Sequence, residues 1–238
     1  MQVMLATPAH DFRADVYYFN SVLETVRLCS GKGVQVHPVF WPGEALVQHA
    51  RNALVQLALD AGVDQVLMID SDQEWRAEQA LALLRYPVDV VGAAVRKKTD
   101  AEEKYNVLAK SPYMQEDDKT GLWVVEAVGT GFLRVSVKAL RAVWERATEY
   151  DHNGKKFRMI FEPLVVDGRL VGEDTIFCHK LHAAGFPVHV DPSFTVTHNG
   201  MKQYKGDFRA YVARLQAAIA PTAPEVTSPS PNSFQVGY

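Results

Sequence analysis

Two carboxylates that follow an apolar run are the first residues in this sequence whose types and spacing could do chemistry. Asp70 and Asp72 are separated by one serine and come directly after the strand-like run 63–69. In an open α/β sheet, ligands bind outside the carboxyl ends of the strands. Carboxylates at that edge can hold Mg²⁺ or Mn²⁺, which in turn binds phosphate oxygens. The tripeptide Asp-x-Asp also occurs in polar turns and at helix N-caps, and its position after a strand is what favours a metal site.

A histidine late in the chain is a second candidate. His198 is followed by Asn199 and Gly200 and ends the strand-like segment 194–198. Imidazole is compatible with Mn²⁺ alongside two carboxylates, and a glycine two residues later permits close approach of the backbone to a phosphate. A single histidine is also commonly structural, so His198 stays a candidate on this pattern alone.

A third candidate is the acidic pair Glu173 and Asp174, which follows Gly172 and opens an apolar helical pattern. Acidic side chains at a helix N-terminus are favoured by capping and by the helix dipole, so a purely structural role is open. The catalytic interpretation is a general base. A sugar transfer with inversion needs a carboxylate that takes the proton from the attacking hydroxyl, and Asp174 is the candidate for it.

These residues need elements that bring them together, and the apolar patterning predicts such elements. Up to about residue 100, strand-like runs alternate with helical periodicity, which is typical of parallel βαβ units. We expect an α/β protein whose first half resembles a doubly wound nucleotide-binding fold. The strands are expected at 2–6, 34–40, 63–69 and 88–95, and the helices at about 16–30, 44–61 and 77–85.

From about residue 105 the pattern changes to that of a mixed sheet. We expect one domain over 1–220, in which 1–100 bind the nucleotide and 101–220 hold the acceptor and the catalytic residues. The tail 221–238 is rich in Pro, Ser and Thr and is predicted to be disordered. In the second half, strands are expected at 122–128, 132–135, 187–190 and 194–198, and helices at 137–148 and 175–184.

Composition bounds the class of protein. The chain of 238 residues is 47% hydrophobic and 22% charged, which is ordinary for a soluble domain with one core. No run approaches the roughly 18 to 20 apolar residues of a membrane span, and the N-terminus lacks a signal-peptide pattern, so we expect a cytoplasmic protein. Cys29 and Cys178 are expected to be core thiols. The net charge of −3 excludes a globally basic, nucleic-acid-coating protein, and the oligomeric state is open.

The order of these motifs is similar to that of GT-A glycosyltransferases, and looks closest to small enzymes encoded by bacteriophages and related bacterial loci. The resemblance covers about 2–200. It implies the GT-A fold, with a Rossmann-like half and a mixed-sheet acceptor half. The matching segments are Thr7-Pro8, Ala50-Arg51-Asn52, Asp70-Ser71-Asp72, Val128-Gly129-Thr130-Gly131-Phe132, Gly172-Glu173-Asp174 and His198-Asn199-Gly200.

The resemblance also implies a role for each matching position. Asp72 and His198 would bind Mn²⁺ or Mg²⁺, and Asp70 would contact the metal or the donor ribose. Asp174 would be the catalytic base, supported by Glu173. The positions implied to contact the nucleotide are Thr7, Pro8, Arg51, Ser71 and Gly200, and those implied to form the floor beside the acceptor are Gly129, Thr130 and Gly131.

The implied reaction is metal-dependent transfer, with inversion, of a sugar from a nucleotide diphosphate donor, with UDP as the expected nucleotide, to a hydroxyl. Basic groups at 96–98, 155–158 and 202–205 are expected in loops around the acceptor. If they converge, they favour a polyanion such as a hydroxymethylated pyrimidine in phage DNA, flipped or single-stranded, in the host cytoplasm. The acidic overall charge argues against DNA, and a saccharide or a protein is the alternative acceptor.

Two other classes of protein could combine a nucleotide-binding sheet with carboxylates at its edge. A nucleotidyltransferase pairs a similar sheet with carboxylate-held metal but usually carries a glycine-rich, basic loop after its first strand, which 6–10 is not. A non-catalytic nucleotide-sugar-binding module would leave Glu173 and Asp174 with a capping role only. Turnover of a donor separates the module from the transferase.

Overall fold

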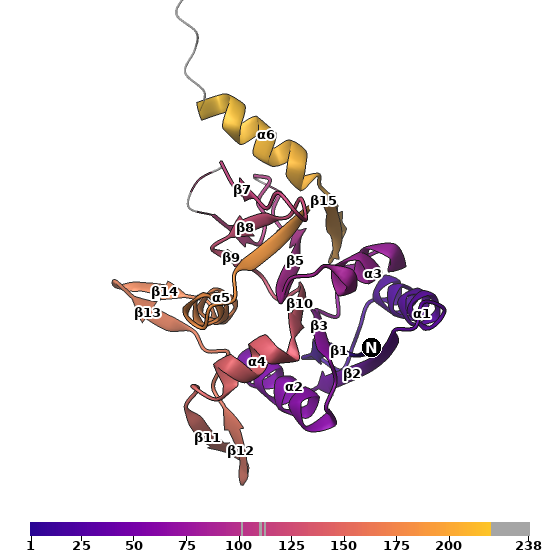
Figure 1. Ribbon diagram of the computed structural model, residues 1–238, viewed down its shortest axis with the longest axis vertical. Helices are drawn as coiled ribbons and strands as arrows, with labels where there is room; N and C mark the ends of the chain where they lie inside the picture. The colour runs from indigo at the N-terminus through magenta and orange to yellow at the C-terminus, as the bar shows by residue number, and fades with distance from the viewer. Residues whose placement is uncertain (101, 110, 112, 220–238) are drawn as a thin grey trace, which may run out of the picture.

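The protein is one layered α/β unit in which a central sheet is covered by helices on both faces (Figure 1). The computed structural model describes residues 1–100, 102–109, 111 and 113–219, so the predicted disordered tail lies outside the described residues. The main strands are β1 (Gln2–Ala9), β2 (Gln35–Pro42), β3 (Gln65–Ile69), β5 (Val90–Val95), β7 (Gln115–Glu116), β8 (Trp123–Val125), β10 (Phe132–Ser136) and β15 (Val188–Asn199).

The order of strands across the sheet is β2-β1-β3-β10-β5-β15-β8-β7. Strand β1 is parallel to both β2 and β3, and β5 is parallel to β15, whereas β10 is antiparallel to both of its neighbours. Strands β2, β1, β3, β5 and β15 therefore run in one direction, and the central sheet is mostly parallel, as the sequence predicts. Strand β10 comes from the second half of the chain but lies between two strands of the first half, so both halves build one sheet.

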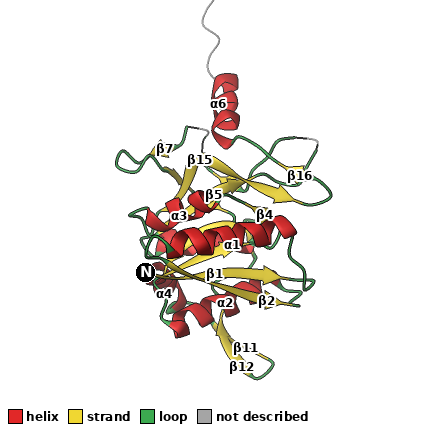
Figure 2. Ribbon diagram, turned by 90° about the vertical axis from the view of Figure 1, so that its right-hand side faces the viewer, coloured by secondary structure: helices red, strands yellow, loops and turns green. Residues whose placement is uncertain are grey.

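Helices on the two faces enclose two apolar cores. The helices α1 and α3 lie together on one face, and α2, α4 and α5 cover the other (Figures 1 and 2). None of the helices within the described residues is long and apolar enough to span a membrane. Their bounds are Val16–Ser30 for α1, Val47–Ala61 for α2, Ala77–Arg85 for α3, Val137–Trp144 for α4, Glu173–Ala183 for α5 and Phe208–Ile219 for α6.

Short strands complete the molecule. The two-stranded hairpins β11–β12 and β13–β14 project from its body (Figure 1). Strands β4 and β16 pair with the end of β15, and β6 pairs with β9. Their bounds are Gln73–Glu74 for β4, Val107–Leu108 for β6, Ala127–Val128 for β9, Glu149–His152 for β11, Lys155–Arg158 for β12, Leu164–Val166 for β13, Arg169–Val171 for β14 and Gln203–Tyr204 for β16.

Several predicted boundaries are wrong for local reasons. Helix α2 begins at Val47, three residues after the predicted start, because Gly43 turns the chain with φ +73° and the Glu44 carboxylate accepts a hydrogen bond from the Leu46 amide. The predicted strand 122–128 is split into β8 and β9, which pair with different partners. The two segments predicted at 187–190 and 194–198 form the single strand β15, which carries an irregularity between Asp191 and Thr195.

The cysteines and one tryptophan belong to the core. Cys29 and Cys178 are free and fully buried, which confirms the prediction of core thiols. Trp75 is 5% exposed, packs on Tyr18 and Phe132, and donates a hydrogen bond from its indole nitrogen to Thr25 of α1. Trp75 therefore supports the sheet beneath the site.

Candidate functional site

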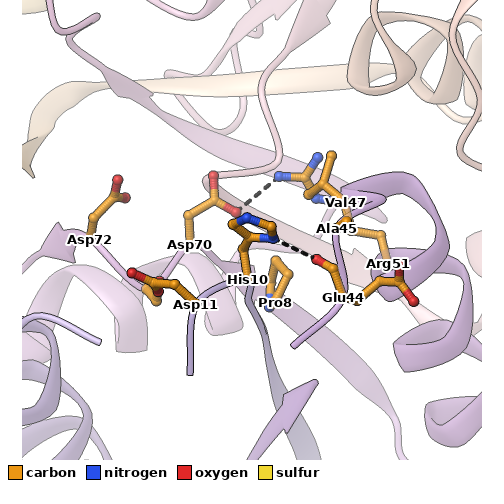
Figure 3. A pocket seen from close by; sticks show the side chains of 10 residues that line it. Pro8, His10, Asp11, Glu44, Ala45, Val47, Arg51, Asp70 and Asp72 are labelled. Atoms are coloured by element: carbon orange, nitrogen blue, oxygen red, sulfur yellow. Dashed lines mark hydrogen bonds and ion pairs between the residues drawn. The ribbon is translucent and has the colours of Figure 1, made fainter. Parts of the chain in front are cut away.

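A cleft of about 280 Å³ opens at the edge of the sheet where β1, β2 and β3 end (Figure 3). These three strands are mutually parallel, so the residues that follow them meet at one edge. The start of α2 forms one wall. The residues that line the cleft are Pro8, His10, Asp11, Glu44, Ala45, Val47, Arg51, Asp70, Ser71 and Asp72.

Arg51 of α2 joins two of the predicted acidic residues. Its guanidinium donates to Asp70 Oδ1 at 2.9 Å and to Glu173 Oε1 at 2.5 Å, and the side chain is only 8% exposed. Burial opposes the charge on Arg51, but the carboxylates of Asp70 and Glu173 outweigh it and raise the pKa of the guanidinium. Arg51 therefore carries a permanent positive charge that ties α2, the end of β3 and the start of α5 together.

Asp72 and His198 meet because β4 pairs with β15. In that antiparallel pair His198 lies opposite Gln73, and the Asn199 amide donates to the Asp72 carbonyl at 2.8 Å. The imidazole Nε2 of His198 then lies 3.3 Å from Asp72 Oδ2. Residues 126 positions apart in the chain are thus brought to the same point.

The chemistry of this pair fits a metal ion. Nδ1 of His198 lies 2.9 Å from the Arg96 carbonyl, which can only accept a hydrogen bond, so Nδ1 carries a proton. In the neutral ring Nε2 then directs its lone pair at a carboxylate oxygen, and two lone pairs face each other only with a cation between them. A proton or a divalent ion can be that cation, and a backbone carbonyl that fixes the outer ring nitrogen is the usual support of a histidine ligand.

Lys98 supplies a positive charge at the same carboxylate. Its ammonium lies 2.6 Å from Asp72 Oδ2, the oxygen that faces His198. Burial works against the charged form of Asp72, but the hydrogen bonds from His198 and Lys98 outweigh it and lower its pKa to about 2. Asp72 is consequently an ionised carboxylate throughout the neutral range.

The glycine-rich segment 129–131 lies directly against the carboxylates. The Asp70 amide donates to the Gly131 carbonyl, and a Cβ on Gly131 would come within 3.1 Å of Asp70 Oδ2. A Cβ on Gly129 would come within 2.8 Å of the Asn106 side chain. Thr130 between them is buried, and its hydroxyl has no hydrogen-bond partner among the described residues. The segment is close-packed, and Thr130 offers a free polar atom beside Asp70 and Arg51 in the same small cavity.

The predicted base lies at the start of α5. Asp174 is half-buried, and its Oδ1 accepts a hydrogen bond from the adjacent Thr175 amide at 2.7 Å. It also contributes to the raised pKa of Arg51, so it shares the electrostatic network of the cleft. Asp174 is not among the residues that line the cleft beside Asp72.

Other predicted positions fall above and below the cleft surface. Pro8 and Ser71 line it, and the Ser71 carbonyl accepts a hydrogen bond from the amide of Asp15, the N-cap of α1. Thr7 is fully buried, and its hydroxyl forms a 2.5 Å hydrogen bond with the Tyr18 hydroxyl, so it lies beneath the surface. Gly200 packs against the aliphatic part of Lys98. Of the predicted nucleotide contacts, Thr7 and Gly200 are thus placed to support neighbouring residues.

Three residues that line the cleft, and Lys98 beside Asp72, were not predicted although a signal for them existed. His10 and Asp11 follow β1, Glu44 follows β2 and Lys98 follows β5, so each comes just after a parallel strand. The rule that singled out Asp70 and Asp72 applies equally to them. None belongs to a recognisable motif, and Lys98 stood out only as part of a basic group.

The three basic groups do not converge on one place. Arg96 donates to the Lys205 carbonyl, and Lys202 pairs with Asp100 at 2.5 Å, so the groups 96–98 and 202–205 lie together. The group 155–158 belongs to strand β12, in a separate hairpin that packs against α2. Its location in a strand corrects the prediction of a loop.

Comparison with known proteins shows similarity in fold. No protein-family model matches this chain, and no curated protein matches it significantly. The crystal structure of A197 from STIV is similar with a TM-score of 0.51 at 15% identity, over 84% of this chain and 86% of that one.

Two further structures align less well. A glycosyltransferase involved in the glycosylation of the major capsid of PBCV-1 aligns with a TM-score of 0.35 at 14% identity, over 61% of this chain and 66% of that one. S. aureus TarS 1-349 aligns with a TM-score of 0.46 at 13% identity, over 92% of this chain and 65% of that one. The similarity in fold therefore rests on A197 alone, and an activity has to be argued from the site.

Proposed function

We propose that this protein is a metal-dependent glycosyltransferase of the GT-A type that uses a nucleotide diphosphate sugar. The observation that carries the proposal is the meeting of Asp72 with His198 at the sheet edge, in the same cleft as Asp70 and Arg51. A carboxylate and an imidazole suit Mn²⁺, and Mg²⁺ would rely on the carboxylates and water. The volume of about 280 Å³ is close to the low end for small-molecule sites, which suits a diphosphate and its immediate neighbours.

The proposed roles follow from where the side chains lie. Asp72 and His198 would hold the ion, which supplies positive charge to the departing diphosphate. Arg51 fixes the orientation of Asp70, leaving the second carboxylate oxygen available to the ion or to the donor. Lys98 is held beside Asp72 and would turn to the diphosphate when the ion takes its place.

The proposed chemical step is a single displacement. The acceptor oxygen forms a bond to the anomeric carbon while the bond from that carbon to the diphosphate oxygen breaks. Asp174 takes the proton of the acceptor hydroxyl, and the configuration of the sugar inverts. Glu173, held by Arg51, would keep the start of α5 in place against the cleft.

The acceptor is proposed to be a hydroxylated molecule of low charge, such as a saccharide or a protein side chain. A DNA acceptor would need unpaired cations along a track. Two of the basic groups lie together, but Lys98 pairs with Asp72 and Lys202 pairs with Asp100. This pairing weakens the case for a hydroxymethylated pyrimidine in DNA, which stays in the experiment as one of the acceptors.

The test is release of nucleoside diphosphate from a panel of nucleotide sugars with Mn²⁺, with and without saccharides or hydroxymethylated DNA. The wild type should release it from one donor, and Asp72→Ala should abolish both this release and metal-dependent donor binding. Asp174→Asn should spare donor binding but lose transfer. Asp118→Asn, an exposed carboxylate outside the cleft, is the matched control and should behave as the wild type.

Each outcome bears on a separate part of the proposal. Normal turnover by Asp72→Ala would show that Asp72 does not hold a required metal ion. Normal turnover by Asp174→Asn would show that Asp174 is not the catalytic base. Donor binding without turnover of any donor or acceptor would favour a nucleotide-sugar-binding module. Stimulation by DNA alone would restore the nucleic-acid acceptor.

A further inference from the structure

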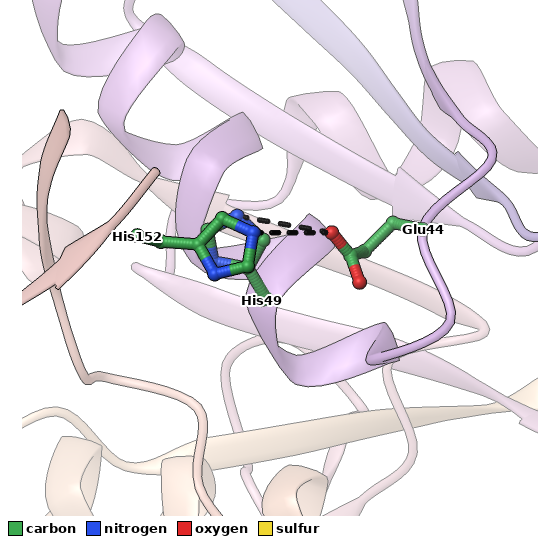
Figure 4. A group of neighbouring side chains, drawn as sticks. All are labelled: Glu44, His49 and His152. Carbon is green, nitrogen blue, oxygen red and sulfur yellow. Dashed lines mark ion pairs between the residues drawn. The ribbon is translucent and has the colours of Figure 1, made fainter. Parts of the chain in front are cut away.

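A second group of ligand-type side chains includes Glu44, which lines the opposite side of the cleft from Asp72 (Figure 3). His49 comes from the first turn of α2, His152 from the end of β11, and Glu44 from the turn that precedes α2 (Figure 4). Nε2 of His49 is 3.9 Å and Nε2 of His152 is 4.0 Å from the same oxygen, Oε2 of Glu44. One ligand atom of each residue lies within 4.8 Å of the other two.

The surroundings of His49 prepare it as a ligand. Nδ1 lies 2.7 Å from the Tyr150 hydroxyl, and with the proton on Nδ1 the lone pair of Nε2 points toward the carboxylate and the second imidazole. The two imidazole rings lie 4.0 Å apart between centroids, a contact that suits neutral rings.

We propose that His49, His152 and Glu44 form a second divalent-metal site, of the zinc type and separate from the Asp72–His198 pair. Two histidines and one glutamate with an open fourth position are an established set of ligands for Zn²⁺. Bonds of about 2.0–2.1 Å in a tetrahedron place ligand atoms roughly 3.4 Å apart. The separations of 3.9 and 4.0 Å would therefore close by about half an ångström when the ion binds.

The site would add a metal link between the hairpin β11–β12 and the turn that precedes α2, next to the existing contact of the Tyr150 hydroxyl with His49. His152 belongs to the projecting hairpin β11–β12, while Glu44 lines the cleft and its carbonyl meets His10 Nδ1 at 3.0 Å. A metal ion bound here fixes the hairpin against the cleft wall. His152 is 37% exposed at its side chain, so the ion can enter from solvent. This inference does not depend on the proposed transferase activity.

The experiment is titration of the metal-free full-length protein with Zn²⁺, and with Co²⁺ as a spectroscopic probe. The Asp72→Ala background removes the first site, so one equivalent of tightly bound ion is expected there, with visible Co²⁺ bands of tetrahedral type. In the same background His152→Ala should weaken binding at least about 100-fold, because loss of even an outer-shell partner costs 10–100-fold. His37→Ala, a histidine that pairs with Gln2 instead, should leave the affinity unchanged.

Stability of the variants keeps the result interpretable. His152→Ala should unfold at the same temperature as its parent in EDTA, and only the parent should gain stability on addition of Zn²⁺. Glu44→Gln, which retains size and hydrogen bonding, should weaken binding in the same way. Equal Zn²⁺ affinity in His152→Ala and its parent, or no bound ion in the Asp72→Ala background, would overturn the proposal.

Discussion

Lys98 and the proposed ion compete for one carboxylate oxygen. The ammonium lies 2.6 Å from Asp72 Oδ2, so an ion bound between this oxygen and His198 competes with it. We expect EDTA to abolish nucleoside diphosphate release by the wild type. Lys98→Met should bind Mn²⁺ more tightly, because the competing cation is gone, as measured by Mn²⁺ titration. Activity that survives EDTA but is lost in Lys98→Met would show that the lysine itself neutralises the diphosphate.

The same cluster predicts how stability depends on pH. Folding lowers the pKa of Asp72 from 3.8 to about 2. Burial alone would raise this pKa, but the hydrogen bonds from His198 and Lys98 outweigh burial. A carboxyl group whose pKa is lower in the folded state stabilises the fold at any pH above its unfolded-state pKa. It loses this contribution as the pH falls through its folded-state pKa. Wild type without metal should therefore lose stability relative to Asp72→Asn between about pH 4 and pH 2, as measured by urea unfolding. A difference that stays constant over this range would contradict the ion pair.

At the scale of elements, sequence patterning was enough for the parallel strands and for the carboxylates at their ends. Strand β3 is apolar from Val66 to Ile69, and the rule for parallel sheets places Asp70 and Asp72 at the ligand-binding edge. The helix α3 was predicted with its observed bounds, Ala77–Arg85. These features depend on local periodicity, which a sequence displays directly.

Features that depend on contacts between distant segments could not be predicted. The apolar pattern of strand β10 does not indicate which strands it pairs with. Its pairing with β3 in the assembled sheet is what places Gly131 against Asp70. Lys98 meets Asp72 only because the segments that follow β5 and β3 lie close together in the fold. His49 meets His152 only because the hairpin β11–β12 packs against α2.

The hairpins were not predicted because their strands are only three or four residues long. Helix α6 was missed although Phe208, Val212 and Leu215 recur at helical spacing.

One buried side chain joins α3 to the sheet and gives a prediction at this scale. Arg134 on β10 is 1% exposed and donates to the carbonyls of Leu83, Tyr86 and Val88 at the end of α3, and burial lowers its pKa to about 10. Removing it leaves the buried Leu83 carbonyl and the part-buried Tyr86 and Val88 carbonyls without this donor, at about 1–3 kcal/mol for a buried group and less for the others.

Arg134→Met should therefore lose about 3 kcal/mol of unfolding free energy in urea titration, near the upper end for single substitutions. Arg27→Met is the control, since Arg27 forms only an exposed pair with Glu24, and exposed pairs contribute about 0–1 kcal/mol. A loss for Arg134→Met no larger than the control would mean that water or backbone movement satisfies the carbonyls.

In the whole molecule, the site is built at one edge of a single sheet, to which both halves of the chain contribute strands. The ends of β1, β2 and β3 supply the cleft, the end of β5 leads to Lys98, and the end of β15 supplies His198. Because β10 links β3 to β5 in the sheet, displacement of either half would separate Asp72 from His198. Ligand binding at this edge should therefore raise the free energy of global unfolding.

Mass action makes that expectation quantitative. A ligand that binds only the folded state stabilises it by about 2.7 kcal/mol at 100 times its dissociation constant. Mn²⁺ together with the nucleoside diphosphate of the preferred donor should raise the unfolding free energy of the wild type by this amount in urea titration. Asp72→Ala should show no such gain, whereas His152→Ala should keep most of it, because His152 is not among the residues that line the cleft. Equal stabilisation of Asp72→Ala and wild type would place the diphosphate away from Asp72, and the metal-dependent mechanism would then have to be abandoned.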